Sequence, residues 1–266
     1  FLEVIMKKIL VILLIIVFAC SLFVLSACEK DKKTVLYVYT ESGFPPFEYS
    51  KGDEIVGVDI EIAKAIAKEL GMELVVRDVM FDSIVSGINE DNAIGLAGIT
   101  ITPDREQAVD FSIPYFGDAI QYVIYPKGAL ELNDELMIEG DLLKNKVLGV
   151  QTGTTGDNIV QVEVKEGGLF AGATAKGYDN ALIAADDIGS GCDYVVIDRL
   201  TALQIAAANN NLEASQIAGL DAESYGIAVK KGNKVLLNAI NWILHNLLEE
   251  GKIDQWLEEH SESIEE

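Results

Sequence analysis

Two hydroxyls and a cation follow a strand-like run in the first half of the chain. Residues 97–112 are AGITITPDREQAVDFS, in which Thr100, Thr102 and Arg105 come just after the apolar stretch. A proline behind a strand end favours a helix start, and the free N–H groups of a helix N-terminus attract anions. The guanidinium of Arg adds a planar fork of donors that matches a carboxylate. The segment therefore indicates an anion site, although an exposed Arg at an ordinary helix start would give the same pattern.

An acid ends another strand-like run in the second half of the chain. In CDYVVIDRL, the apolar residues 194–197 predict a strand that ends at Asp198. The carboxyl ends of strands in an open α/β sheet face the crevice where ligands bind. Asp198 could also cap the helix expected from about Leu200, and the two roles are compatible.

The segment QTGTTGDN, residues 151–158, is rich in glycine and in hydroxyl groups. It lacks the lysine of a nucleotide-binding phosphate loop, so we do not expect a nucleotide there. A loop that opens a helix after a strand still presents backbone N–H groups to an anion. The alternative is a plain polar turn.

The elements that must position these residues follow an alternating pattern. Short β-branched runs alternate with helical periodicity, which predicts an α/β fold. The helix expected within 56–72 has Asp59 as its N-cap and Gly71 at its end. A second series of strands and helices begins near Lys146, and a helix over 233–250 closes the chain.

Two such series with a shared final segment predict two lobes. The extended crossings between them are expected near 117–126 and 218–229. The first lobe would be discontinuous, with residues 34–120 and 225–266, and the second would hold residues 121–224. The cleft between the lobes is then the natural place for a ligand.

Residues 1–28 have the pattern of a secretory signal. A positive end at residues 6–8 precedes an almost uninterrupted apolar run over 9–25. The run leads into LSAC, which resembles a bacterial lipobox and implies cleavage before Cys28 and lipid attachment to its sulfur. Residues 29–33 would then be a short linker. The alternative is an uncleaved signal anchor, which would also leave the rest of the chain outside the membrane.

The net charge and the few cysteines and histidines limit which partners, covalent links and metal sites are possible. The chain of 266 residues has a formal net charge of −23, which argues against nucleic acid because binding it needs a basic face. Only Cys192 lies beyond the signal, so no internal disulfide is possible. His245 falls within an apolar periodicity and His260 in an acidic tail, so neither forms a metal or catalytic pair. We expect no metal and no cofactor.

Four segments together resemble the bacterial extracellular solute-binding proteins that deliver polar amino acids to ABC importers. They are FPPFEYSKGDEIVGVDIEIAKAIAKELG, AGITITPDREQAVDFSIPYF, VLGVQTGTTGD and YGIAVKKGN, and the resemblance runs from about Thr34 to His260. It implies a type II periplasmic-binding-protein fold, with two α/β lobes linked by two hinge crossings. It also implies an extracytoplasmic, lipid-anchored monomer that hands a free amino acid to an ABC permease.

The resemblance assigns roles to the charged residues. Arg105 matches the residue that binds the ligand's α-carboxylate, while Gly98 and Thr100 match positions that contact its amino end. Asp198 matches the acid that binds the α-ammonium group. These residue types suit a zwitterion, because each charge taken out of water needs a partner and hydrogen bonds.

Further roles come from both lobes. Thr155 matches a hydroxyl and amide donor to the same carboxylate, and Gln151 matches a side-chain contact. Phe44 and Phe81 match aromatic positions that sandwich the ligand's side chain, although an aromatic ring is more often part of a core. Glu41 matches a position where relatives often place an acid near the ligand's distal nitrogen, and its alternative is a solvated acid at a strand end.

Two departures bear on the substrate. The position before Asp198, a His in some glutamine binders, is Ile197, and the Lys that such proteins carry in the second-lobe loop is Gln151. Glu41 and the negative field of the chain favour a ligand with a cationic or amide side chain.

Two other functions are compatible with the pattern. Some relatives of this fold are dehydratases acting on prephenate or arogenate, and Glu41 would then serve as the general acid. Nothing else in the sequence supports turnover. A sensory ectodomain would use the same cleft for ligand recognition.

Overall fold

The computed structural model describes Met6 and residues 34–262. The chain divides into a unit of Phe1–Thr34 and a unit of Val35–Glu266. Cys28 and the linker 29–33 lie outside the described residues, as does the predicted signal apart from Met6. In the described part of the chain, no helix has both the length and the apolar character that crossing a membrane requires.

The first sheet combines strands from both ends of the second unit. Its order is β5-β1-β6-β15-β7. The strands are β1 (Val35–Thr40), β5 (Glu73–Asp78), β6 (Ala93–Gly95), β7 (Val109–Phe111) and β15 (Ala228–Lys230). β1 runs parallel to β5 and β6, whereas β15 runs antiparallel to β6 and β7. The C-terminal part of the chain therefore completes a sheet that the N-terminal part begins.

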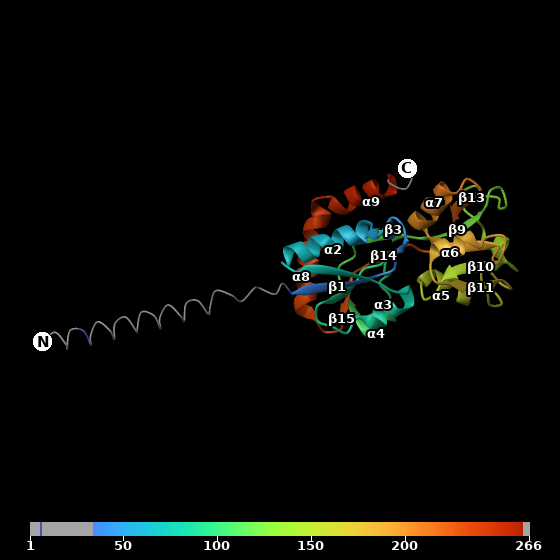
Figure 1. The fold of residues 1–266 in the computed structure, drawn as a ribbon. Coiled ribbons are helices and arrows are strands. Elements are labelled where there is room, and N and C mark those ends of the chain that lie inside the picture. Colours follow the sequence, from blue (N-terminus) through green and yellow to red (C-terminus); the bar gives the residue numbers. More distant parts are fainter. Residues whose placement is uncertain (1–5, 7–33, 263–266) are drawn as a thin grey trace. The chain divides into compact units, whose positions relative to one another are not determined.

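Helices cover both faces of this sheet (Figure 1). They are α2 (Val58–Glu69), α3 (Phe81–Gly87), α4 (Arg105–Ala108), α8 (Lys234–Glu249) and α9 (Lys252–Glu262). Side chains alternate along β1, so Leu36 and Val38 join the core with α2, α8 and α9, while Tyr37 and Tyr39 pack on the side of α3. Each fully buried aliphatic side chain stabilises the fold by about 1.5–3 kcal/mol.

The start of α2 differs from the prediction. The N-cap is Gly57 and not Asp59, which lies in the first turn and is fully buried. A small sheet of β2 (Gly43–Phe44), β3 (Glu48–Lys51) and β4 (Glu54–Val56) precedes the helix. Gly57 has a φ of 130°, and an added Cβ would lie 2.1 Å from the Phe47 carbonyl oxygen. This close approach requires glycine and places Asp59 next to the start of β3.

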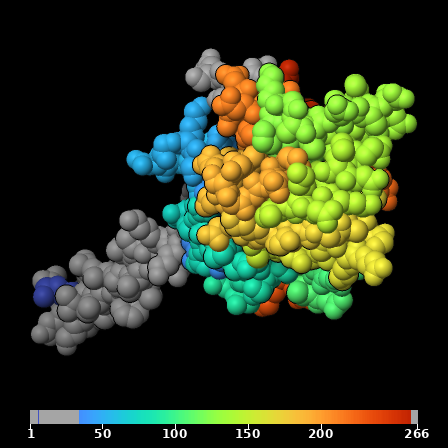
Figure 2. All heavy atoms as spheres, turned by 90° about the vertical axis from the view of Figure 1, so that its right-hand side faces the viewer, coloured from blue at the N-terminus to red at the C-terminus, as the bar shows by residue number. Residues whose placement is uncertain are grey.

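The second sheet is built wholly from the middle of the chain, in the order β11-β10-β12-β9-β13. Its strands are β9 (Gln121–Pro126), β10 (Val147–Gln151), β11 (Thr174–Tyr178), β12 (Tyr194–Asp198) and β13 (Leu212–Gln216). The helices that accompany it are the 3-10 helix η1 (Gly140–Leu143), α5 (Thr155–Glu163), α6 (Ala181–Asp186) and α7 (Arg199–Ala208). Segments of this sheet and its helices form the face nearest the viewer in Figure 2. The two sheets define the two lobes of the fold.

Two antiparallel strands link the lobes. They are β8 (Phe116–Ala119) and β14 (Glu223–Tyr225), and their register pairs Ala119 with Glu223 and Phe116 with Tyr225. The first crossing is shorter than predicted, because residues 121–126 form β9, which pairs with β12 and β13 inside the second sheet. Tyr225 is fully buried and packs edge-on against Phe47, with ring centroids 5.1 Å apart.

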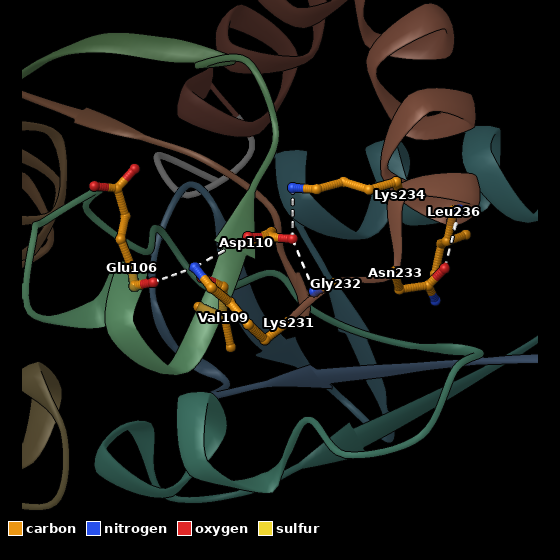
Figure 3. A network of polar contacts seen from close by, with 8 residues as sticks. All are labelled: Glu106, Val109, Asp110, Lys231, Gly232, Asn233, Lys234 and Leu236. Atoms are coloured by element: carbon orange, nitrogen blue, oxygen red, sulfur yellow. Dashed lines mark hydrogen bonds and ion pairs between the residues drawn. The ribbon is translucent and has the colours of Figure 1, made fainter.

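A charged network ties the C-terminal segment to the first sheet (Figure 3). Asp110 in β7 accepts hydrogen bonds from the Gly232 amide at 2.9 Å and from Lys234 Nζ at 2.8 Å, and it lies 3.1 Å from Lys231 Nζ. Its pKa is held below the usual range, chiefly by Lys234 and the Gly232 amide. Asn233 caps α8 by accepting from the Leu236 amide at 3.2 Å. The network thus anchors the start of α8 beside β7.

Candidate functional site

A cavity lies where the two lobes meet, and the space within it, counted together with its opening to solvent, is about 280 Å³. Both lobes contribute to its lining, which consists of Phe44, Phe81, Ala97, Gly98, Thr100, Arg105, Gln151, Thr154, Thr155 and Asp198. The structure therefore brings together all of the predicted ligand contacts except Glu41 in one lining. Their role in binding a ligand stays a prediction.

Arg105 spans the cleft. It is the first residue of α4, as the Thr-x-Thr-Pro pattern indicated. Its Nη1 donates to the Thr100 carbonyl at 2.9 Å, and its Nη2 donates to the Gly153 carbonyl of the opposite lobe at 3.1 Å. The guanidinium carbon lies 5.2 Å from the centre of the Phe81 ring. Burial lowers the pKa of Arg105, while Glu223 and Asp198 oppose that shift.

Asp198 is the last residue of β12, which confirms the predicted strand end. It occupies the N-cap position of α7, but its side chain makes no capping hydrogen bond. Instead, its Oδ1 accepts from Gln121 Nε2 at 3.0 Å. Burial, and after it the nearby Glu223, raises the pKa of Asp198 to about 7. The carboxyl group is thus free of helix capping and sits at the carboxyl edge of the sheet.

Glu41 stands behind the lining and reaches the cavity through Gln151. Gln151 Nε2 donates to Glu41 Oε2 at 2.9 Å and to the Asp179 carbonyl at 3.4 Å. Glu41 is buried rather than solvated, with 7% of its surface exposed. Burial raises its pKa to about 7, and the hydrogen bond from Gln151 partly offsets this effect.

The loop before α5 is a helix start and not a plain polar turn. Thr154 is the N-cap, and its Oγ1 accepts from the Asp157 amide at 3.1 Å. Thr155 is the first residue of the helix and is buried in the cavity wall. Thr154 lines the cavity as well, although the sequence did not single it out.

The aromatic wall is part of a larger cluster. Phe44 stacks on Phe47 with ring centroids 5.7 Å apart and meets Tyr225 edge-on at 6.3 Å. Gly98 has a φ of +53°, and an added Cβ would lie 2.7 Å from Phe44 Cε1. The Gly98 backbone is therefore in contact with the Phe44 ring. A side chain at position 98 would collide with that ring, so the position requires glycine.

One residue of the site was missed by the sequence analysis. Oε2 of Glu223, on the crossing strand β14, accepts from Thr100 Oγ1 at 3.1 Å and from Thr155 Oγ1 at 2.7 Å. Glu223 thus joins a hydroxyl of each lobe. Its position two residues before Tyr225, inside a predicted crossing, was the available signal.

The electrostatic balance of the site is acidic. Arg105 faces both Glu223 and Asp198, and Glu41 lies close by. Among the described residues, no group of three or more His, Cys, Asp and Glu is arranged to hold a metal ion. The site therefore suits a ligand that brings an anionic group and more than one positive charge.

Comparison with known proteins identifies the family. The sequence profile of the bacterial extracellular solute-binding proteins, family 3, matches residues 36–262. The chain belongs to this family. The solute-binding protein is 30% identical over 254 residues to the arginine-binding extracellular protein ArtP of Bacillus subtilis, covering 91% of this chain and 94% of ArtP.

Two further similarities span nearly the whole solute-binding protein. A probable histidine-binding protein of Neisseria gonorrhoeae is 32% identical over 252 residues, covering 89% of this chain and 90% of that protein. The structure of the amino acid ABC transporter substrate-binding protein AbpA of Streptococcus pneumoniae, bound to L-arginine, matches with a TM-score of 0.76 at 29% identity. That match covers 87% of this chain and 96% of AbpA. These similarities agree with the type II fold implied by the sequence motifs.

Proposed function

We propose that this solute-binding protein captures a free amino acid with a cationic side chain, of the arginine type, and delivers it to the permease of an ABC importer. The observation that supports this most directly is the placement of Arg105 and Asp198 in one cavity lining. A guanidinium and a carboxylate in the lining of one cavity complement the two charges of an α-amino acid.

The proposed preference for a cationic side chain rests on the remaining acids. Glu41 and Glu223 lie around the cavity, and Arg105 is the one cation among the described residues of its lining. A cationic side chain would pair with the ionised forms of these acids, which a neutral side chain cannot do. The arginine-binding ArtP and the arginine-bound AbpA lend support from relatives. An amide side chain such as that of glutamine is the second candidate, because Gln151 offers both a donor and an acceptor.

Ligand analogues test the two halves of the site separately. Isothermal titration with L-arginine, L-lysine, L-ornithine, L-histidine and L-glutamine should show the tightest binding for one of the cationic amino acids. Agmatine lacks the carboxylate that Arg105 would bind, and 5-guanidinopentanoic acid lacks the ammonium that Asp198 would bind. Each loss should weaken binding by about tenfold or more. Equal affinity for agmatine and arginine would contradict the proposed role of Arg105.

Delivery follows from lobe closure in this proposal. The first lobe comprises residues 34–120 and 225–266 and the second comprises 121–224, and they close by bending at β8 and β14. A shift of the closed state from 1% to 99% needs a ligand preference of about 5.5 kcal/mol. Two well-formed charge pairs offset by desolvation are of this order.

The proposal includes a lipid anchor at Cys28 and a monomeric state. Labelling of cells with a fatty-acid probe should mark the wild-type protein and leave a Cys28→Ser variant unmarked. Release of unlabelled wild-type protein into the medium would contradict the anchor. We propose no turnover, so L-arginine recovered after prolonged incubation should be chemically unchanged.

A further inference from the structure

Two acids are buried side by side beneath the cavity. Glu48, the first residue of β3, is 1% exposed, and Asp59 in the first turn of α2 is fully buried. The start of α2 lies beside the start of β3, because the Asp59 amide donates to the carbonyl of Phe47, the residue before Glu48, at 2.9 Å. Neither acid lines the cavity, and neither has a part in the ligand contacts described above.

Asp59 is hydrogen-bonded to the backbone of a residue that lines the cavity. Its Oδ2 accepts from the Gly98 amide at 2.9 Å and from the Tyr115 hydroxyl at 2.9 Å. Gly98 itself lines the cavity. A backbone unit has one donor and one acceptor, so Gly98 can offer a ligand only its carbonyl oxygen. An acceptor at this position suits an ammonium group and not a carboxylate.

The other oxygens of the pair lack donors. Within the described part of the chain, Asp59 Oδ1 and both carboxyl oxygens of Glu48 have no hydrogen-bond donor. Two ionised carboxylates buried together without a cation would be strongly destabilising. One proton on Glu48 supplies the missing donor, because a protonated carboxyl group can donate to the neighbouring carboxylate.

We propose that Glu48 and Asp59 form a carboxylic acid–carboxylate pair that fixes Gly98 from behind, so that its carbonyl is held as an acceptor for the ligand's ammonium group. Both residues are positioning residues. This inference rests on the proposed function for the identity of the ligand, but the pair and its grip on Gly98 stand on the contacts alone.

The surroundings agree with Glu48 as the protonated partner. Burial raises the pKa of Glu48 well above its usual range, and Asp59, Glu41 and Asp78 raise it further. Burial raises the pKa of Asp59 to about 7, against the hydrogen bonds from Gly98 and Tyr115, which favour its ionised form. Tyr115 and Tyr225 also face the pair, and their own pKa values are raised, so both stay neutral. The pair then carries one negative charge beneath the ammonium site.

Infrared spectroscopy tests the shared proton without any ligand. At about pH 8.5, above the raised pKa values of the other cavity acids, the wild-type protein should retain a carbonyl band of a protonated carboxylic acid. Glu48→Gln should remove that band. A difference spectrum without this loss would overturn the proposal, because Glu48 would then carry no proton. Glu61→Gln, a half-exposed acid in α2 two residues after Asp59, is the control and should leave the band in place.

Hydrogen exchange and affinity test the effect on Gly98. Glu48→Met keeps the length of the side chain but removes the donor, so the Gly98 amide should exchange at least about tenfold faster and L-arginine should bind about tenfold more weakly. Glu48→Gln restores a donor towards Asp59 and should return both values to within about threefold of wild type. Equal behaviour of the Gln and Met variants would overturn the positioning role.

The double variant Glu48→Gln/Asp59→Asn keeps the shape of the pair and removes its charge, so it covers the case in which Glu48→Met fails to fold. Its affinity for L-arginine should fall by about tenfold, and an unchanged affinity would overturn the role of the charge. If the wild-type protein binds no amino acid, the proposed function fails. The infrared band and the exchange rate of the Gly98 amide would still show whether Glu48 and Asp59 share a proton and position Gly98.

Discussion

Oε2 of Glu41 accepts a hydrogen bond of 2.9 Å from Nε2 of Gln151, and this contact joins the two lobes. Glu41 follows the last residue of β1, and Gln151 is the last residue of β10. Both therefore stand at the carboxyl ends of parallel strands, where open α/β sheets bind ligands. The contact leaves a buried acid next to a cavity that also holds Arg105 and Asp198.

Glu41→Gln is expected to change specificity. The substitution keeps the size of the side chain but removes its negative charge, so the affinity for L-arginine should fall by about tenfold or more. The affinity for L-glutamine should change by less than about threefold, because a neutral side chain gains little from the charge. Isothermal titration with both ligands measures the ratio. Asp53→Asn, at an exposed turn, is the control, and a parallel loss for both ligands would contradict a side-chain role for Glu41.

Arg105→Lys is expected to weaken every amino-acid ligand. Lysine keeps the charge but loses the planar fork of donors, and it cannot span from Thr100 to Gly153 as the guanidinium does. The dissociation constant should rise by about 100-fold, and the ligand-induced shift in Tm should largely disappear. Arg77→Lys is the control, because that guanidinium packs on Tyr37 at 3.9 Å, outside the cavity lining. A retained shift in Arg105→Lys would place the carboxylate site elsewhere.

Glu223→Ala is expected to open the ligand-free protein. Glu223 accepts from Thr100 of one lobe and Thr155 of the other, so its carboxylate holds the lobes together without a ligand. Loss of two charge-assisted hydrogen bonds should lower the ratio of closed to open protein by about tenfold or more. Small-angle scattering of the ligand-free variant should give a larger radius of gyration than wild type. Asp221→Ala, an exposed residue of the same crossing, should scatter as wild type does.

The pH dependence of stability follows from three buried acids. The pKa values of Glu41, Asp59 and Asp198 are each raised to about 7, whereas these groups titrate near 4 in an unfolded chain. The folded state therefore binds these protons more tightly. Its extra stability is fully present below about pH 4 and is lost as the pH rises through about 7. The ligand-free Tm should thus be higher at about pH 5 than at about pH 8, by about 2–4 °C for each kcal/mol retained.

Ligand binding should show the opposite trend with pH. In the proposed complex, ionised Asp198 and Glu41 pair with the ammonium and the cationic side chain of the ligand, so protonation of these acids should weaken binding below about pH 7. Calorimetric Tm values with and without L-arginine across this range measure both effects. A ligand-free Tm that falls between about pH 8 and pH 5 would contradict the raised pKa values.

Gly98→Ala is expected to damage both stability and binding. The new Cβ would lie 2.7 Å from Phe44 Cε1, and the φ of +53° is unfavourable for alanine. Gly52→Ala is a matched control, because Gly52 has a φ of +64° but nothing within 4 Å of an added Cβ. The control should lose about 1 kcal/mol from the backbone effect, and Gly98→Ala should lose more and no longer respond to L-arginine. Equal losses of stability in the two variants would show that the Phe44 ring moves aside to accommodate the new methyl group.

The local sequence pattern was sufficient to predict several of the helices and strands, including those that carry Arg105 and Asp198. The helix predicted over 233–250 is α8, Lys234–Glu249, and the strand predicted to end at Asp198 is β12. Arg105 begins α4 behind a proline, as its spacing indicated. These features depend on side-chain period, caps and turn residues within a few positions of one another, so the chain encodes them locally.

The pairings across the cleft depended on the packing of distant segments. Glu223 reaches Thr100 from 123 positions away, and Gln121 reaches Asp198 from 77 positions away. Asp59 was predicted as an N-cap because acids are common there, yet Gly57 takes that position and the buried Asp59 side chain accepts from the Gly98 amide. The amino-acid order was enough to establish the α/β elements and the charged residues available to a site. Which carboxyl groups are buried, and which donors they meet, was settled only when two sheets packed together, because burial and hydrogen-bond geometry are properties of the folded chain and not of neighbouring residues.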